Sequence, residues 1–139
     1  MKALVVDYAG VFTDDGMPEV VATMRARGIK TALLSNADAV PAGLPDVFDA
    51  VVVSGVAGVA KPDEAIYRHA AQLLGVGPGD CVFVDDVARY VRGAVQVGMV
   101  GVHHRDLEST VDELAVLFGL AAAADQFEAE DGGGGGDVE

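Results

Sequence analysis

Short apolar runs alternate with amphipathic stretches along this chain, and no other feature constrains its fold as strongly. The first of these runs, 3–6, is short, continuous and apolar, which is typical of a parallel strand buried on both faces. Strands that alternate with helices predict a parallel sheet covered on both sides. We therefore expect an α/β fold, a doubly wound three-layer sandwich around a five-stranded, mainly parallel sheet. The expected strands are 3–6, 31–34, 50–53, 81–84 and 99–102, and the expected helices cover about 18–27, 62–74, 87–97 and 106–120.

The negative charge of the chain is concentrated toward its end. The 139 residues carry a net charge of −13, and six of the 22 acids lie in 121–139, which contains five consecutive glycines and no base. Such a segment cannot bury enough apolar surface to offset its chain entropy. We expect one domain at 1–120 and a flexible, acidic, glycine-rich tail at 121–139. Because the domain is also acidic, nucleic acid is not an expected partner.

Hydropathy and cysteine content indicate the cellular setting. No apolar run approaches the roughly 20 residues that a membrane-spanning helix needs, and Asp7 interrupts the first apolar run too early for a signal peptide. The single cysteine, Cys81, cannot form an intramolecular disulfide, which fits a reducing compartment. We expect a cytoplasmic protein with no membrane partner.

Polar residues follow four of the expected strands where each strand ends. In a parallel sheet these ends meet at one edge, where ligands bind. One acid or serine at a strand end is commonly a cap or turn residue. Three carboxylates, a hydroxyl and an amine at one edge instead indicate a functional site. These residues are Asp7, the pair Ser35-Asn36, Lys61 after the third strand and its loop, and the pair Asp85-Asp86.

These residues resemble, in order and spacing, the four motifs of the haloacid dehalogenase (HAD) superfamily of phosphohydrolases. The segments 59–67 and 82–86 carry the most specific part of the resemblance, which covers about residues 3–104. The resemblance implies a HAD-like, Rossmann-type fold. It also implies a phosphatase-like hydrolase that transfers phosphoryl groups through an aspartyl-phosphate, with Mg²⁺ as cofactor.

The resemblance assigns a role to each residue, and the chemistry of the side chains agrees. Asp7 is the expected nucleophile, and Lys61 is expected to orient it and to neutralise transition-state charge. Mg²⁺ prefers hard oxygen ligands. Its expected ligands are Asp7, the backbone carbonyl of Ala9, and Asp86 with Asp85 beside it, while Ser35, Asn36 and Lys61 are expected to bind phosphate.

The sequence departs from the HAD pattern at Ala9. HAD phosphatases usually carry an aspartate there that protonates the leaving oxygen, and a methyl group cannot transfer a proton. A general acid is typically worth 10²–10⁴-fold, so alkyl phosphates are expected to react slowly. The fold expectation is unaffected, whereas the expected activity is weakened or specialised.

Several functions remain open after this departure. An acyl phosphate needs no acid assistance, and halide release in dehalogenation tolerates its absence. The phosphonoacetaldehyde hydrolase branch shares Asp-x-Ala-Gly, but it uses a further lysine, and Lys2 and Lys30 lie at the opposite sheet edge. The alternative class is a catalytically impaired phosphate- and metal-binding regulatory or interaction module. An inactive structural partner is the third interpretation.

Spacing leaves no room for a cap domain over the site. Asp7 and Ser35 are 28 positions apart, and Ser35 and Lys61 are 26 apart, so a helix and a strand use most of each interval. The expected partner is therefore a phosphorylated substrate, large or protein-borne, unless a second copy of the chain covers the site in a homo-oligomer.

Two further polar pairs occur outside the motifs. The pair Asp14-Asp15 lies in a turn and is interpreted as solvated, although either acid could replace the missing proton donor. The pair His103-His104 follows the fifth strand and is expected at the surface rather than in a metal site.

Overall fold

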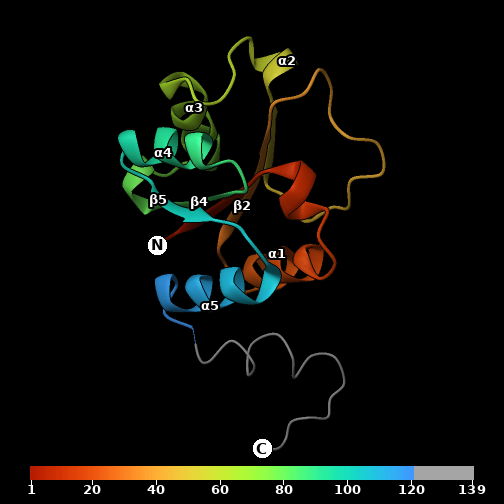
Figure 1. Cartoon of the computed structure of the whole chain (residues 1–139), viewed down its shortest axis with the longest axis vertical. Coiled ribbons are helices and arrows are strands. Elements are labelled where there is room, and N and C mark those ends of the chain that lie inside the picture. The colour runs from red at the N-terminus through yellow and green to blue at the C-terminus, as the bar shows by residue number, and fades with distance from the viewer. Residues whose placement is uncertain (121–139) are drawn as a thin grey trace, which may run out of the picture.

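The computed structural model describes residues 1–120, which form a five-stranded sheet with helices on both faces (Figure 1). All four strand pairings are parallel, in the order β3-β2-β1-β4-β5. The expected doubly wound α/β fold is therefore confirmed. The strands are β1 (Ala3–Val6), β2 (Lys30–Ser35), β3 (Ala50–Val53), β4 (Cys81–Asp85) and β5 (Val100–His103).

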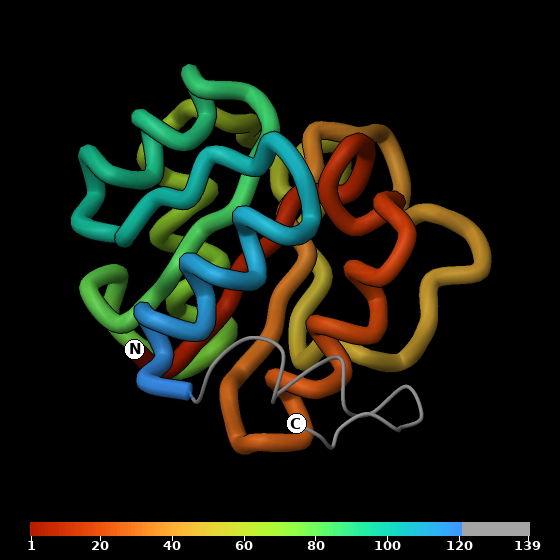
Figure 2. The backbone as a smooth tube through the Cα atoms, turned by 60° about the horizontal axis from the view of Figure 1, so that its bottom comes forward, coloured from red at the N-terminus to blue at the C-terminus, as the bar shows by residue number. Residues whose placement is uncertain are grey.

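Side chains that alternate along the strands build two separate cores. Ala3 and Val5 of β1 pack with α3 (Glu64–Leu74) and α4 (Ala88–Gln96), whereas Leu4 and Val6 pack with α1 (Met17–Ala26) and α5 (Leu107–Leu117). Because both faces are covered, the central strand β1 is apolar at every position. Figures 1 and 2 show the two helix pairs on opposite sides of the sheet.

The short elements are those that the apolar pattern did not predict. A π-helical turn (Tyr8–Phe12), the one-turn helix α2 (Ser54–Ala57) and a 3₁₀ turn (Pro78–Asp80) connect the larger elements. Each is too short to show a hydrophobic period. Two of them, the π-helical turn and α2, directly follow the carboxyl ends of β1 and β3 and so lie beside the candidate site.

Strand order places the candidate site at the middle of one sheet edge. β1 is paired with β2 on one side and with β4 on the other, so the chain changes winding direction there. Ligands of open parallel sheets bind outside the carboxyl ends of the strands at such a point. Within residues 1–120 one sheet and its helices make up the whole fold, and none of these helices is long and apolar enough to cross a bilayer. The predicted tail at 121–139 lies outside the described residues.

Candidate active site

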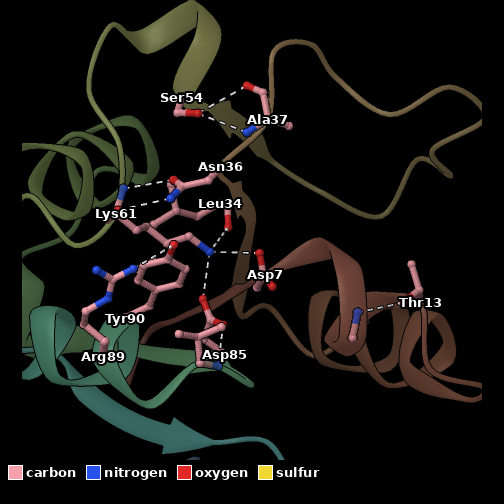
Figure 3. Close-up of polar contacts among 12 residues, drawn as sticks. Asp7, Thr13, Leu34, Asn36, Ala37, Ser54, Lys61, Asp85, Arg89 and Tyr90 are labelled. Atoms are coloured by element: carbon pink, nitrogen blue, oxygen red, sulfur yellow. Dashed lines mark hydrogen bonds and ion pairs between the residues drawn. The ribbon is translucent and has the colours of Figure 1, made fainter.

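A buried lysine connects the ends of three strands at this edge. The Lys61 ammonium donates to Asp7 Oδ1 at 2.8 Å, to Asp85 Oδ2 at 2.7 Å and to the Leu34 carbonyl at 3.1 Å (Figure 3). Its side chain is 1% exposed, so these three acceptors replace the water that a buried ammonium loses. Lys61 therefore holds the ends of β1, β2 and β4 together.

Asn36 fixes the main chain of this lysine. Its Nδ2 donates to the Lys61 carbonyl at 3.1 Å, and its Oδ1 accepts from the Lys61 N–H at 2.9 Å. Because Lys61 belongs to neither a helix nor a strand, this pair of hydrogen bonds replaces the restraint of regular structure. The Asn36 side chain thus positions Lys61, and the phosphate contact expected of Asn36 stays a prediction.

Two aromatic rings lie against the Lys61 ammonium. The ring centroid of Tyr90 is 4.9 Å from Nζ and that of Phe83 is 5.5 Å away. A cation at this distance is attracted to the ring face. Tyr67 packs edge-on against Phe83 and donates its hydroxyl to the Tyr90 carbonyl at 2.7 Å, which fixes both neighbours.

Three carboxylates gather where the metal site was expected. Asp7, Asp85 and Asp86 each place an oxygen within 4.8 Å of the others, close enough for one cation to contact all three. Asp85 is fully buried, and its two oxygens already accept from Lys61 Nζ and from the Val87 N–H at 3.0 Å. Asp86 is exposed, and no side-chain hydrogen bond engages its carboxylate within the described residues. Asp86 is therefore the more available of the adjacent pair for a metal ion.

Electrostatics also favour a cation at this edge. Burial raises the pKa of Asp85 to about 6, while Lys61 opposes this shift and the neighbouring Asp7 charge adds to it. The cluster of three carboxylates has one ammonium in contact with it, so its charge is only partly compensated. Hard oxygen donors with excess negative charge are the ligand set that suits Mg²⁺.

The π-helical turn brings its backbone against this cluster. Gly10 has φ +81°, a left-handed conformation that favours glycine, and a Cβ at this position would meet the Asp86 carboxylate. Ala9 beside it has ψ 127°, which turns its carbonyl out of the helical direction. Thr13 Oγ1 accepts from the Gly10 N–H at 2.9 Å and steadies the turn. The expected backbone ligand thus comes from a segment that is shaped to approach Asp86.

Ser35 ends β2 beside this cluster. It is 7% exposed, and its hydroxyl has no hydrogen-bond partner within residues 1–120. A buried hydroxyl without a partner carries a desolvation cost that a bound oxyanion would relieve. Its predicted role in phosphate binding remains a prediction that this location supports.

The expectation that His104 lies at the surface is wrong, whereas Asp14 lies in a turn with its side chain 42% exposed. His104 is buried, with Nε2 2.6 Å from Asp14 Oδ2 and Nδ1 2.7 Å from Thr110 Oγ1. The chain after β5 turns inward at His104, whose N–H donates to the Asp85 carbonyl, whereas His103 is exposed as expected. Asp14 is therefore engaged, which leaves it poorly placed to serve as a substitute proton donor.

Sequence reasoning missed Tyr90 and Arg89, which border the site from the first turn of α4. The signal for them was weak, because an aromatic residue five positions after a strand is equally typical of core packing. The paired roles of Asn36 and Lys61 were also missed, since the two residues meet across 25 positions.

Comparisons with known proteins identify the family of this chain. The sequence profile described as haloacid dehalogenase-like hydrolase matches residues 2–98. A phosphatase from Mycobacterium tuberculosis is 39% identical over 83 residues, which are 54% of this chain and 38% of that protein. The chain thus spans well under half the length of this relative.

Solved structures give the same fold. An uncharacterised protein from Corynebacterium glutamicum matches with a TM-score of 0.80 and 37% identity, over 88% of this chain and 98% of that one. A HAD family enzyme from Bacteroides thetaiotaomicron, solved with magnesium and inorganic phosphate, matches with a TM-score of 0.61 over 79% of this chain and 98% of that one. At 13% identity, this second likeness concerns the fold alone.

Proposed function

Because the chain belongs to the haloacid dehalogenase-like hydrolases, we propose that it is a phosphatase-like hydrolase that uses Asp7 as its nucleophile. The observation that carries the proposal is the contact of Lys61 with both Asp7 and Asp85 beside the open carboxylate of Asp86. The named relatives that are phosphatases support the same reaction class.

In the proposed mechanism the two oxygens of Asp7 have different tasks. Oδ1 accepts from Lys61, which fixes the carboxylate, and Oδ2 is left to attack phosphorus. The bond to the leaving group then breaks, and that group departs with the bonding electron pair. Water attacks the resulting aspartyl-phosphate, which releases phosphate and restores Asp7.

The remaining residues bind the phosphoryl group and compensate its charge. The Ser35 hydroxyl would hold a phosphoryl oxygen, whereas the Lys61 ammonium, whose three N–H groups donate to Asp7, Asp85 and the Leu34 carbonyl, would compensate charge through Asp7. Mg²⁺, held by Asp7, Asp86 and the Ala9 carbonyl with Asp85 beside them, would let an anionic phosphate approach the anionic nucleophile. Asp85 acts through Lys61, because both of its oxygens already accept hydrogen bonds.

Ala9 restricts the proposed substrates to those with good leaving groups. Its methyl group cannot donate a proton, and Asp14 is held by His104. An acyl phosphate releases a carboxylate, which needs no protonation, whereas an alkyl phosphate must release an alkoxide. We therefore propose acyl phosphates as the preferred substrate class.

The edge of the sheet is open, since residues 1–120 supply no domain above it. We propose a capless hydrolase that admits a large or protein-borne phosphorylated substrate, unless a second copy covers the site. A cytoplasmic setting remains part of this proposal and rests on the single cysteine.

The test is to assay acetyl phosphate and glycerol phosphate with Mg²⁺, using wild type, Asp7→Asn and Ala9→Asp. We expect turnover of acetyl phosphate that Asp7→Asn abolishes, and at least a tenfold gain on glycerol phosphate from Ala9→Asp, since a general acid is worth about 10²–10⁴-fold. Asp112→Asn is the matched control, because Asp112 is exposed on α5 and its side chain makes no hydrogen bond or ion pair within the described residues.

Ala9 also favours a second candidate, a phosphate- and metal-binding regulatory or interaction module with impaired catalysis. Binding of Mg²⁺ and vanadate without turnover of either substrate would support this module and reject the hydrolase. Failure to bind Mg²⁺ would reject both.

A further inference from the structure

Arg89 lies beside the candidate site, with its guanidinium against the ring of Tyr90. Its Cζ is 5.1 Å from the centroid of the Tyr90 ring, and its Nη2 donates to the Tyr90 hydroxyl at 3.4 Å. Within residues 1–120 it forms no ion pair, and its side chain is exposed. Arg89 is thus an oriented guanidinium whose charge no carboxylate of the described chain offsets.

The Tyr90 ring is itself held in place by its neighbours. The Tyr90 carbonyl accepts from the buried Tyr67 hydroxyl, and the Tyr90 ring packs over Lys61. A planar guanidinium that lies against a ring loses less conformational freedom when it binds an anion. It also keeps other N–H donors free to form the paired hydrogen bonds that suit a carboxylate or phosphate.

The position of Arg89 relates it to the nucleophile. Figure 3 shows the Tyr90 ring between Arg89 and the Lys61 ammonium, which contacts Asp7. The two distances to the ring centroid place the Arg89 Cζ within about 10 Å of Lys61 Nζ. Because Nζ is 2.8 Å from Asp7 Oδ1, the Arg89 Cζ is no more than about 13 Å from that oxygen, a span that a substrate with an anion at each end can cover.

Charge limits where a second anion could be placed. Three carboxylates surround the reaction centre, so a second anionic group near them would be repelled. The Arg89 side of the opening offers a cation instead. We propose that Arg89 is a specificity-determining residue that binds a second oxyanion, a carboxylate or phosphate, at the far end of the substrate. The proposal rests on the proposed function. The preferred substrates would then carry an anionic group at each end.

Non-hydrolysable ligands test this inference without requiring turnover. The probes are 4-carboxybenzylphosphonate and its uncharged amide, 4-carbamoylbenzylphosphonate, titrated by calorimetry in the presence of Mg²⁺. We expect wild type to bind the carboxylate about three- to tenfold more tightly than the amide, as for a charge-assisted contact at an exposed site. Arg89→Gln should remove this preference and leave the affinity for the amide unchanged.

Arg92→Gln is the matched control. Arg92 is exposed on the same helix, has no hydrogen-bond or ion-pair partner in the described residues and lies about one turn further along α4. Its loss alters the net charge but should retain most of the preference. Three results would overturn the inference. These are equal affinities of wild type for the carboxylate and the amide, a preference for the carboxylate that survives Arg89→Gln, and no binding of either phosphonate. A preference for the carboxylate without turnover of any phosphate would reject the hydrolase and keep the role of Arg89.

Discussion

At the scale of single residues, the position of Lys61 depends on Asn36. The Asn36 amide satisfies both the N–H and the carbonyl of Lys61, and these groups lie outside regular structure. If the main chain shifts, the ammonium no longer meets Asp7 and Asp85 together. Displacements of about 1 Å can cost 10²-fold in rate.

We therefore predict that Asn36→Ala lowers kcat on acetyl phosphate about 10- to 100-fold while KM changes less. Loss of two partly buried hydrogen bonds should also lower the free energy of unfolding by about 1–3 kcal/mol. Steady-state kinetics and urea unfolding measure both effects. Gln72→Ala removes an exposed amide as the control, and an unchanged kcat in Asn36→Ala would contradict the positioning role.

Cys81 is a residue whose environment makes it inert. It is fully buried at the start of β4, and burial, followed by the Asp80 charge, raises the pKa of its thiol to about 11. Only the thiolate reacts with disulfide reagents. We predict that the folded protein leaves an aromatic disulfide reagent unreacted at pH 8, whereas the guanidinium-unfolded chain reacts with one equivalent. Cys81→Ala gives the blank, and rapid labelling of the folded protein would show that β4 opens readily.

At the scale of elements, the sequence predicts the site residues that follow strands but not those placed by loops and helix packing. Asp7, Ser35, Lys61 and Asp86 could be predicted because parallel topology alone brings strand ends to one edge. The pairing of His104 with Asp14 could not, since it joins residues 90 positions apart through the path of the chain after β5. Tyr90 likewise required the angle at which α4 packs on the sheet.

The π-helical turn after β1 (Tyr8–Phe12) yields a prediction about metal affinity. Gly10→Ala would place a methyl group against the Asp86 carboxylate and would strain a residue with φ +81°. We predict that Mg²⁺ affinity, measured by calorimetry, falls about 10- to 100-fold, as for other changes beside metal ligands. Gly43→Ala is the matched control, because Gly43 has φ +73° and nothing within 4 Å. Equal losses in the two variants would indicate backbone strain alone.

Asp49 connects the segment between β2 and β3 to β2 and α1 through hydrogen bonds. Its Oδ2 accepts from the Thr31 N–H at 2.9 Å, and its Oδ1 accepts from Arg25 Nε at 3.2 Å. Burial alone would raise the pKa of Asp49, but the hydrogen bond from Thr31 and the Arg25 charge bring it below its ordinary value of 3.8. Because the folded pKa is lowered, Asp49 stabilises the fold above pH 3.8, and this contribution is lost as the pH falls through the folded value.

We predict that Asp49→Asn lowers the free energy of unfolding by about 1 kcal/mol at pH 7, and that the difference from wild type narrows below about pH 4. Urea titrations across this range measure it. Asp46→Asn should have little effect, since the Asp46 side chain is 97% exposed. A difference that stays constant down to pH 2 would show that the carboxylate charge is not the source of the stability.

At the scale of the whole molecule, what can reach Asp7 depends on what lies above the carboxyl edge of the sheet. The fold needs only the sheet and its helices to assemble Asp7, Lys61 and Asp86. The Corynebacterium glutamicum structure is matched over 98% of its length by 88% of this chain. Within residues 1–120 no further domain closes over the site, so substrate size should be limited by the neighbouring loops alone.

We therefore predict that an aspartyl-phosphate on a folded protein domain is hydrolysed with a kcat/KM within about tenfold of that for acetyl phosphate, because no lid must close before reaction. Phosphate release from both substrates measures the ratio, with Asp7→Asn as the blank. Turnover of acetyl phosphate without turnover of the protein-borne substrate would mean that the edge is covered. Light scattering would then decide the cause, since a dimer would assign the cover to a second copy, whereas a monomer would assign it to the chain itself.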